Sequence, residues 1–233
     1  MNGDGSNSRW WTSLWRRSRG SEQDLAAYRR LALQLHYDLP RPQSDRSVLL
    51  VTPTASALCA HGAATLACCL AEEVSRPVLL MDASPGRPDV TRMLDCAARP
   101  GFVDFLADPE LKLDDLIVPT THDSVFFLPA GTGPGPSSQP VSRDGVGALL
   151  EAVGSRYDFV LLSGGSVLDN SMALALAPHV GCVLLLVIEQ KTTVEDLDAA
   201  QDSLCFCKAR KVGLVLTTPI RGGRWPINGA ARR

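Results

Sequence analysis

The chain has 233 residues, of which 45% are hydrophobic and 21% are charged, and its formal net charge is −2. This length and composition allow one globular α/β domain with a substantial core and short tails. The near-neutral charge gives no general affinity for nucleic acid, and the longest apolar run, residues 182–188, is too short to span a bilayer.

Residues 1–20 are predicted to be a flexible tail in which Trp10, Trp11 and Trp15 stand among arginines. Two interpretations stay open. The tail binds a membrane interface or the groove of a partner, because indole rings prefer interfaces and guanidinium groups bind anions. Alternatively, its tryptophans pack on the surface of the domain. No apolar signal segment is visible in this tail, so the cytoplasm is the expected compartment.

Residues 21–37 are predicted to form a helix, because apolar residues recur at helical spacing. Ser21 is the expected cap of this helix. The apolar stripe comprises Leu25, Tyr28, Leu31 and Leu35.

The stretch from Ser47 to Glu73 predicts a strand, a loop and a helix, the first unit of a parallel sheet. In nucleotide-binding proteins of this build the loop reads G-x-x-x-x-G-K-[ST]. Its glycines let backbone N–H groups surround phosphates, its lysine neutralises them, and its hydroxyl binds Mg²⁺. Between Thr52 and Thr65 this chain has one glycine, Gly62, and no lysine or arginine. The sequence therefore predicts the strand, loop and helix of a phosphate site without the positive charge that binds the phosphate.

Apolar strands alternate with helices along the rest of the chain. The strands are predicted at residues 77–83, 124–130, 157–162, 181–188 and 212–216. The helices are predicted after a cap at Asp89 and at residues 101–107, 113–118, 144–154, 170–177 and 193–206. This pattern predicts a doubly wound, mostly parallel sheet of six to eight strands with helices on both faces. Ligands of such sheets bind beyond the carboxyl ends of the strands, which here include Asp82 and Ser163.

A single domain is therefore expected over residues 21–217, followed by a basic tail of residues 218–233. The chain has seven cysteines, an odd count. No second Cys or His pair accompanies the lone C-x-C of Cys205 and Cys207 at metal-site spacing. We therefore expect neither a metal site nor a disulfide framework.

Five segments outside the loop carry a family pattern in collinear order. They read AAYRRLALQL, VLLMDASPGRPDVTRML, GFVDFLADPELKLDDLIVPT, FFLPAGTGPGPSSQ and the stretch from YDFVLLSGGSVLDN to TTVEDLDAA. Together they resemble the bacterial tyrosine autokinases of polysaccharide assembly (BY-kinases of the CpsD/CapB type), in the MinD/ParA-like branch of P-loop proteins. The resemblance covers roughly residues 25–216 and implies a three-layer P-loop NTPase-like fold.

The similarity breaks down in the phosphate loop. Set against the family's VTSxxPGEGKST and the helix that follows it, the stretch that begins VTPTASALCAHG appears one residue short. The lysine position therefore holds Cys59 or Ala60, depending on where the gap falls. The position of the Mg²⁺-binding hydroxyl holds Ala60 or His61.

The acids and the tyrosines of the family also differ here. Asp82 keeps the first acid of the second motif, whereas Ser84 replaces the second acid and Ser163 replaces the acid of the third motif. Thr217 stands where an adenine-reading Asn often stands, and no tyrosine follows it. Phosphoryl transfer depends on positioning and charge, and losing one preorganised donor typically costs about 10²–10³ in rate. The resemblance therefore predicts a degenerate, empty nucleotide site, which comprises Cys59, Ala60, His61, Asp82 and Ser163.

Surfaces for protein contacts are expected on the first helix and in the tail. Arg29 matches the middle of the family's E-x-x-R-x-x-R helix, which joins subunits into a ring, but Ala26 and Ala32 replace its flanking polar residues. Arg29 either bridges to a partner subunit or is solvated. The expected interface residues are Arg29, Tyr28, Trp10, Trp11 and Trp15.

Three functions follow from these patterns. The first is an interaction or regulatory protein of exopolysaccharide or capsule biosynthesis, without cofactor or small-molecule substrate. It would be cytoplasmic and peripheral to the inner membrane, where it would bind a polysaccharide co-polymerase or export protein, oligomerise or pair with a paralogue. The second is an active autokinase or ATPase that uses ATP and Mg²⁺ through an unusual loop. The third is a partitioning protein of the MinD/ParA kind, which would need ATP-gated dimerisation.

Overall fold

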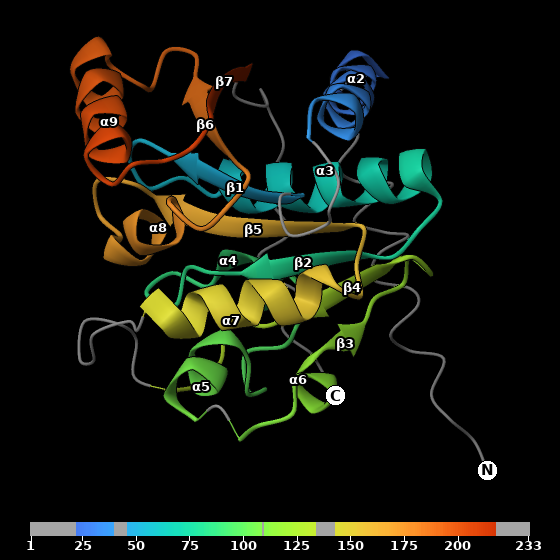
Figure 1. Cartoon of the computed structure of the whole chain (residues 1–233). Helices are drawn as coiled ribbons and strands as arrows, with labels where there is room; N and C mark the ends of the chain where they lie inside the picture. The colour runs from blue at the N-terminus through green and yellow to red at the C-terminus, as the bar shows by residue number, and fades with distance from the viewer. Residues whose placement is uncertain (1–21, 40–45, 109, 134–142, 218–233) are drawn as a thin grey trace, which may run out of the picture.

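The computed structural model describes residues 22–39, 46–108, 110–133 and 143–217 (Figure 1). The strands are β1 (Ser47–Thr52), β2 (Val78–Asp82), β3 (Val118–Pro119), β4 (Val125–Leu128), β5 (Phe159–Ser166), β6 (Cys182–Ile188) and β7 (Val212–Thr217). The helices are α2 (Glu22–Asp38), α3 (Leu58–Val74), α4 (Asp89–Met93), α5 (Phe102–Ala107), α6 (Leu113–Leu116), α7 (Arg143–Gly154), α8 (Ser171–Leu176) and α9 (Val194–Phe206).

The described strands form one seven-stranded sheet in the order β3-β4-β2-β5-β1-β6-β7. Every pairing is parallel except that of β3 with β4. Helices lie on both faces (Figure 1) and bury separate apolar clusters. The predicted fold class, a doubly wound and mostly parallel sheet, is confirmed.

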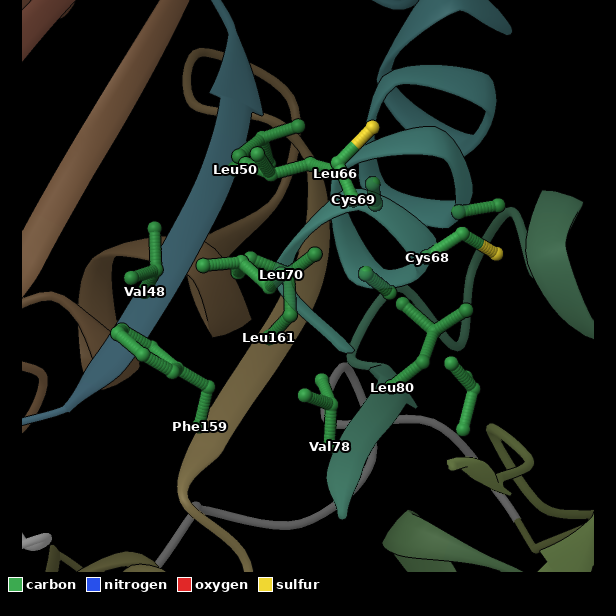
Figure 2. Packing of buried hydrophobic residues seen from close by; sticks show 14 of the residues in the cluster. Val48, Leu50, Leu66, Cys68, Cys69, Leu70, Val78, Leu80, Phe159 and Leu161 are labelled. Carbon is green, nitrogen blue, oxygen red and sulfur yellow. The ribbon is translucent and has the colours of Figure 1, made fainter. Parts of the chain in front are cut away.

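One face of the sheet is covered by α2, α3 and α4. The helix α3 is rich in alanine, which allows close packing on the strands, and its buried side chains include two leucines. Figure 2 shows Leu66 and Leu70 pointing toward the side chains of β1 and β5, among them Val48 and Phe159. The other face is covered by α5, α6, α7, α8 and α9. The strands are therefore apolar at nearly every position because both of their faces are buried.

An ion pair fixes the amino ends of β1 and β5. The guanidinium of Arg46 lies 2.7 Å from Asp158, and both side chains are buried. Arg46 also donates a hydrogen bond to the carbonyl of His36 at 3.0 Å, and its guanidinium lies 4.8 Å from the centre of the Phe159 ring. Arg46 therefore joins the end of α2 to the sheet.

The structure corrects three local predictions. Val118 lies in the short strand β3, antiparallel to β4, because the chain turns back at residues 120–124 instead of continuing the helix. Asp89 is the first residue of α4 and its cap residue is Pro88, so Asp89 does not cap the helix. The strand β5 continues past Leu162 to Ser166, with a register shift opposite Leu50 and Val51.

Ser21 and the two terminal tails lie outside the described residues. In the part of the chain that the structure describes, no helix combines the length and apolarity that a transmembrane span requires.

Candidate functional site

A pocket of about 230 Å³ opens where β1, β2 and β5 end at the carboxyl edge of the sheet. This is the edge at which doubly wound sheets bind ligands. Its lining includes small and hydroxyl-bearing side chains: Cys59, Ala60, Ser84, Ser163, Ser166 and Asn170. Of the predicted site residues, Cys59, Ala60 and Ser163 therefore line one pocket, whereas Asp82 and His61 do not.

Cys59 and Ser163 face each other in the lining of this pocket. The Cys59 thiol donates a hydrogen bond to the carbonyl of Leu50 at 3.2 Å, and its Sγ lies 3.8 Å from Ser163 Oγ. In P-loop NTPases a Ser or Thr of the loop and an Asp of a strand end hold Mg²⁺. Here the facing pair is a thiol and a hydroxyl. Burial raises the pKa of Cys59 to about 11, so the thiol is protonated at neutral pH and supplies no charge for a metal ion.

His61 lies in the first turn of α3 and is partly buried. Its Nδ1 lies 3.3 Å from the carbonyl oxygen of Ala57. Burial lowers the pKa of His61 below its ordinary value, which favours the neutral ring at physiological pH.

The backbone N–H groups at the start of α3 are already partly satisfied within the chain. The N–H of Leu58 donates to Ser56 Oγ at 3.3 Å, and the N–H of Cys59 donates to the Ser56 carbonyl at 3.3 Å. In a phosphate-binding loop such groups point toward the anion. Two of the donors that would bind phosphate therefore have internal acceptors.

The strand β5 fixes the beginning of this loop. The N–H of Val167 donates to the carbonyl of Thr52 at 2.8 Å, and the N–H of Leu168 donates to the carbonyl of Pro53 at 3.1 Å. Ser166 Oγ also donates to the Pro53 carbonyl, at 2.9 Å. The path of the chain as it leaves β1 is thus set by hydrogen bonds to the last residue of β5 and the two residues that follow it.

Among the described residues that line the pocket, Arg87 is the one with a cationic side chain. Its Nε lies 2.9 Å from Asp89 Oδ2, and Arg92 lies 3.5 Å from the other oxygen of the same carboxylate. The positive charge nearest to the pocket is therefore paired with Asp89.

Asp82 ends β2 as a fully buried carboxylate. It accepts hydrogen bonds from Thr91 N at 2.8 Å, from Thr91 Oγ1 at 2.9 Å and from Ser84 N at 3.2 Å. Asp82 therefore satisfies the first turn of α4 and does not pair with Arg87. Burial raises the pKa of Asp82 to about 6, although these hydrogen bonds act in the opposite direction.

Asp82 should make stability depend on pH. Because its pKa in the folded protein lies above its value in the unfolded chain, its contribution is fully present below about pH 4 and is lost as the pH rises through 6. We expect urea unfolding between pH 4 and 7 to show this loss, and the Asp82→Asn variant to lack this component. An unchanged pH profile in the variant would contradict the assignment.

Thr91 is a residue that the sequence did not single out, and it joins two parts of the site. Its hydroxyl donates to Asp82 and accepts a hydrogen bond from Ala130 N at 2.9 Å. The LPAG segment, residues 128–131 at the end of β4, is therefore held against the end of β2. No periodicity or motif marks this hydroxyl, because its partners lie far away in sequence.

The Thr91→Val variant should lose about 1–3 kcal/mol of unfolding free energy, because it removes one of the three donors to the buried Asp82 carboxylate and leaves the Ala130 N–H without its acceptor. Chemical denaturation monitored by far-UV circular dichroism measures this loss. Thr91→Ser is the matched control, since it keeps the hydroxyl and removes one methyl group. Equal losses in the two variants would show that the hydroxyl is not responsible.

The predicted interface residues on α2 contact their own domain. Tyr28 packs against the α3 side of the core, and its hydroxyl lies next to Gly62. Arg29 pairs with Glu72 of α3 at 3.5 Å, and both side chains are well exposed. These contacts do not test whether either residue also binds a partner. Trp10, Trp11 and Trp15 lie outside the described residues.

No family model matches the chain. A curated relative, the "Tyrosine-protein kinase wzc" of Salmonella typhi, is 26% identical over 188 residues, which are 78% of this chain and 25% of the relative. The protein of the same name from Salmonella typhimurium is 24% identical over 188 residues, with the same coverage of both chains. The chain thus spans about a quarter of the length of the curated relatives that it matches.

Solved structures show the fold class. The kinase domain of Escherichia coli tyrosine kinase ETK superposes with a TM-score of 0.76 at 21% identity, over 90% of this chain and 79% of that domain. The BceF tyrosine kinase domain superposes with a TM-score of 0.73 at 24% identity, over 85% of this chain and 79% of that domain. The cell division protein MinD from Aquifex aeolicus superposes with a TM-score of 0.56 at 16% identity, over 73% of this chain and 68% of MinD. The chain therefore has the P-loop, MinD-like fold of bacterial tyrosine-kinase domains. Its sequence is similar to the Wzc kinases at the identities given above.

Proposed function

We propose that this chain is a BY-kinase-like domain of polysaccharide biosynthesis that has lost ATP chemistry and acts through protein contacts. The observation that carries the proposal is the chemistry of the pocket. At the carboxyl edge of the sheet, the pocket is lined by Cys59, Ala60 and Ser163. The arginine in its lining, Arg87, is paired with Asp89. A transferring phosphoryl group needs preorganised positive charge and a metal held by oxygen ligands. The sequence between Thr52 and Thr65 contains no lysine or arginine to supply that charge.

Two further features argue against tight binding of phosphate in this pocket. The N–H groups of Leu58 and Cys59 have internal acceptors. The buried carboxylate of Asp82 already accepts three hydrogen bonds from Thr91 and Ser84, so it has little acceptor capacity left for a metal ion. Because these donors and acceptors are satisfied without a ligand, occupancy by a nucleotide would have to replace existing contacts.

A titration with ATP and Mg²⁺ tests this proposal. We expect no change in Tm at millimolar ATP, because a ligand present at 100 times its Kd would stabilise the fold by about 2.7 kcal/mol and give a visible shift. An active kinase domain of the same fold is the positive control. A saturable rise in Tm, or radiolabel from ATP on Tyr28, Tyr37 or Tyr157, would contradict the loss of ATP chemistry.

The alternative, an active autokinase or ATPase with an unusual loop, is favoured by one observation. A pocket is present at the nucleotide-binding edge of the sheet, and an acid stands at the end of β2 beside it. The titration above distinguishes the two functions.

The proposed partner is an inner-membrane co-polymerase or export protein of the polysaccharide pathway, which would place the chain in the cytoplasm at that membrane. One protein of the same fold, "the chimerical protein CapA2B2", joins two named components and superposes with a TM-score of 0.74 at 16% identity, over 86% of this chain and 87% of the chimera. Capture of such a membrane protein by the tagged chain from its host would support the assignment. Equal capture by a chain without residues 1–20 would exclude the tail as the docking segment.

A further inference from the structure

The last described strand, β7, leaves an apolar row exposed at the edge of the sheet. Val212, Leu214 and Leu216 are 41%, 53% and 72% exposed. Their register partners on β6 include Val183 and Leu185, which belong to the core on the α9 side. The row therefore lies on the α9 face of the sheet, and its exposure rises toward the end of β7. We call these three residues the β7 row.

Within the described residues, the edge of β7 lacks the usual protection against pairing. Natural sheets protect an open edge with lysine, proline, bulges or a covering segment. The sequence of β7 is VGLVLT, which contains no charged residue and no proline. Among the described residues β7 pairs only with β6. An uncharged, half-exposed strand of this kind is expected to be covered in the intact chain.

The charge of the neighbouring helix, α9, indicates which side chains a segment that covers the β7 row should carry. The helix α9 connects β6 to β7 on the same face of the sheet and carries four acidic residues and no basic one: Glu195, Asp196, Asp198 and Asp202. Three of these acids lie in its first two turns, at the edge of the sheet where β7 ends. A covering segment should therefore combine apolar and basic side chains.

The residues that follow β7 have this composition. Residues 218–233 read TPIRGGRWPINGAARR, with four arginines, no acidic residue, and the apolar Ile220, Trp225 and Ile227. Trp225 is eight residues beyond Thr217, so it can reach about 26–29 Å, more than the length of about 20 Å that six residues of strand occupy. A tether this short gives an effective concentration in the millimolar range, which favours this segment over a free partner.

The N-terminal tail is less well placed to cover the β7 row. It joins α2, whose apolar residues pack into the core on the opposite face, the α3 side. Moreover, α2 ends at the amino edge of the sheet, where Lys211 Nζ donates to the Asp38 carbonyl at 3.4 Å. Its beginning therefore lies across the sheet from the β7 row.

We propose that residues 218–233 fold back over the α9 face of β7, with Trp225 and its neighbouring isoleucines on the β7 row and their arginines beside the acids of α9. The contact closes the edge of the sheet and leaves β7 unavailable for pairing with another chain. It does not depend on whether the pocket binds ATP.

Tryptophan fluorescence gives a direct test, because all four tryptophans of the chain lie outside the described residues. In a variant with Trp10, Trp11 and Trp15 replaced by phenylalanine, Trp225 is the only reporter. We expect its emission to be blue-shifted and protected from acrylamide. Leu214→Asn should shift the emission to the red and remove the protection. Leu168→Asn, which changes another exposed leucine away from β7, should leave both unchanged.

The ionic part of the contact has its own test. Glu195→Gln with Asp198→Asn should weaken the protection of Trp225, and so should 1 M salt, at which the Debye length is about 3 Å. Far-UV circular dichroism and Tm of each variant confirm that the domain is folded. Solvent-like emission from Trp225 in the parent, or protection that Leu214→Asn does not alter, would overturn the proposal.

Two other occupants give different results. If the N-terminal tail covers the β7 row, a Trp225→Phe variant will show protected emission from Trp10, Trp11 and Trp15 that Leu214→Asn removes. If a second copy covers it, light scattering will show a dimer of the full chain that Leu214→Asn dissociates. Either result would contradict the proposal. By contrast, self-association that appears only after truncation at Thr217 would support it.

Discussion

Arg46→Met is expected to destabilise the protein by about 3–5 kcal/mol, because it leaves the buried carboxylate of Asp158 without its main counter-charge. The Asp158 side chain is 1% exposed, so water cannot replace the guanidinium. The variant also loses the hydrogen bond to the His36 carbonyl and the contact with the Phe159 ring. Urea unfolding at pH 7 measures the change in unfolding free energy.

A second arginine on the same carboxylate supplies the matched control. Arg76 lies 3.6 Å from Asp158, but its side chain is 53% exposed. Because exposed ion pairs contribute about 0–1 kcal/mol, Arg76→Met should cost no more than that. The double variant Arg46→Met, Asp158→Leu should recover much of the loss, since removing both charges leaves none buried and unpaired. Similar losses for the two arginine variants would contradict this explanation.

Gly101→Ala is expected to cost about 3 kcal/mol, the upper end of what overpacking a core typically costs. A Cβ on Gly101 would overlap the Pro129 carbonyl oxygen and lie 2.6 Å from the carbon of that carbonyl. These are backbone atoms, and they cannot turn away as a side chain would. The N–H groups of Phe102 and Val103 donate to the carbonyls of Pro129 and Ala130, so the same contact holds the start of α5.

Thermal and chemical denaturation of Gly101→Ala should be compared with Gly86→Ala. A Cβ on Gly86 meets no atom within 4 Å, so this second variant should stay within about 0.5 kcal/mol of the parent. If both glycine variants unfold like the parent, the close approach between residue 101 and the LPAG segment does not constrain the fold.

Much of the fold was predictable because both faces of the sheet are buried. A strand covered on two sides must be apolar at nearly every position, and that pattern marked β1, β2, β4, β5 and β6 in the sequence. Parallel strands also bring their carboxyl ends to one edge, which predicted Ser163 there, and the family resemblance placed Cys59 or Ala60 in the same site. The side chains of Cys59 and Ser163 do face each other, at 3.8 Å.

The remaining details depend on contacts between residues far apart in sequence. The two-residue strand β3 is too short to carry a period and exists because it pairs with β4. The role of Thr91 required knowing that Asp82 and Ala130 both lie beside it. The alignment gap in the loop also stayed open in the sequence, because only the structure shows that the side chain facing Ser163 is that of Cys59.

The hydrogen bonds from residues 166–168, at the end of β5, to Thr52 and Pro53 have an evolutionary consequence. They hold the chain where it leaves β1 without help from any bound anion. Residues farther along the loop can therefore change their chemistry while the backbone remains in place. A scaffold of this kind would tolerate substitutions in the loop with little penalty in folding, so the architecture can be inherited independently of the chemistry of the loop.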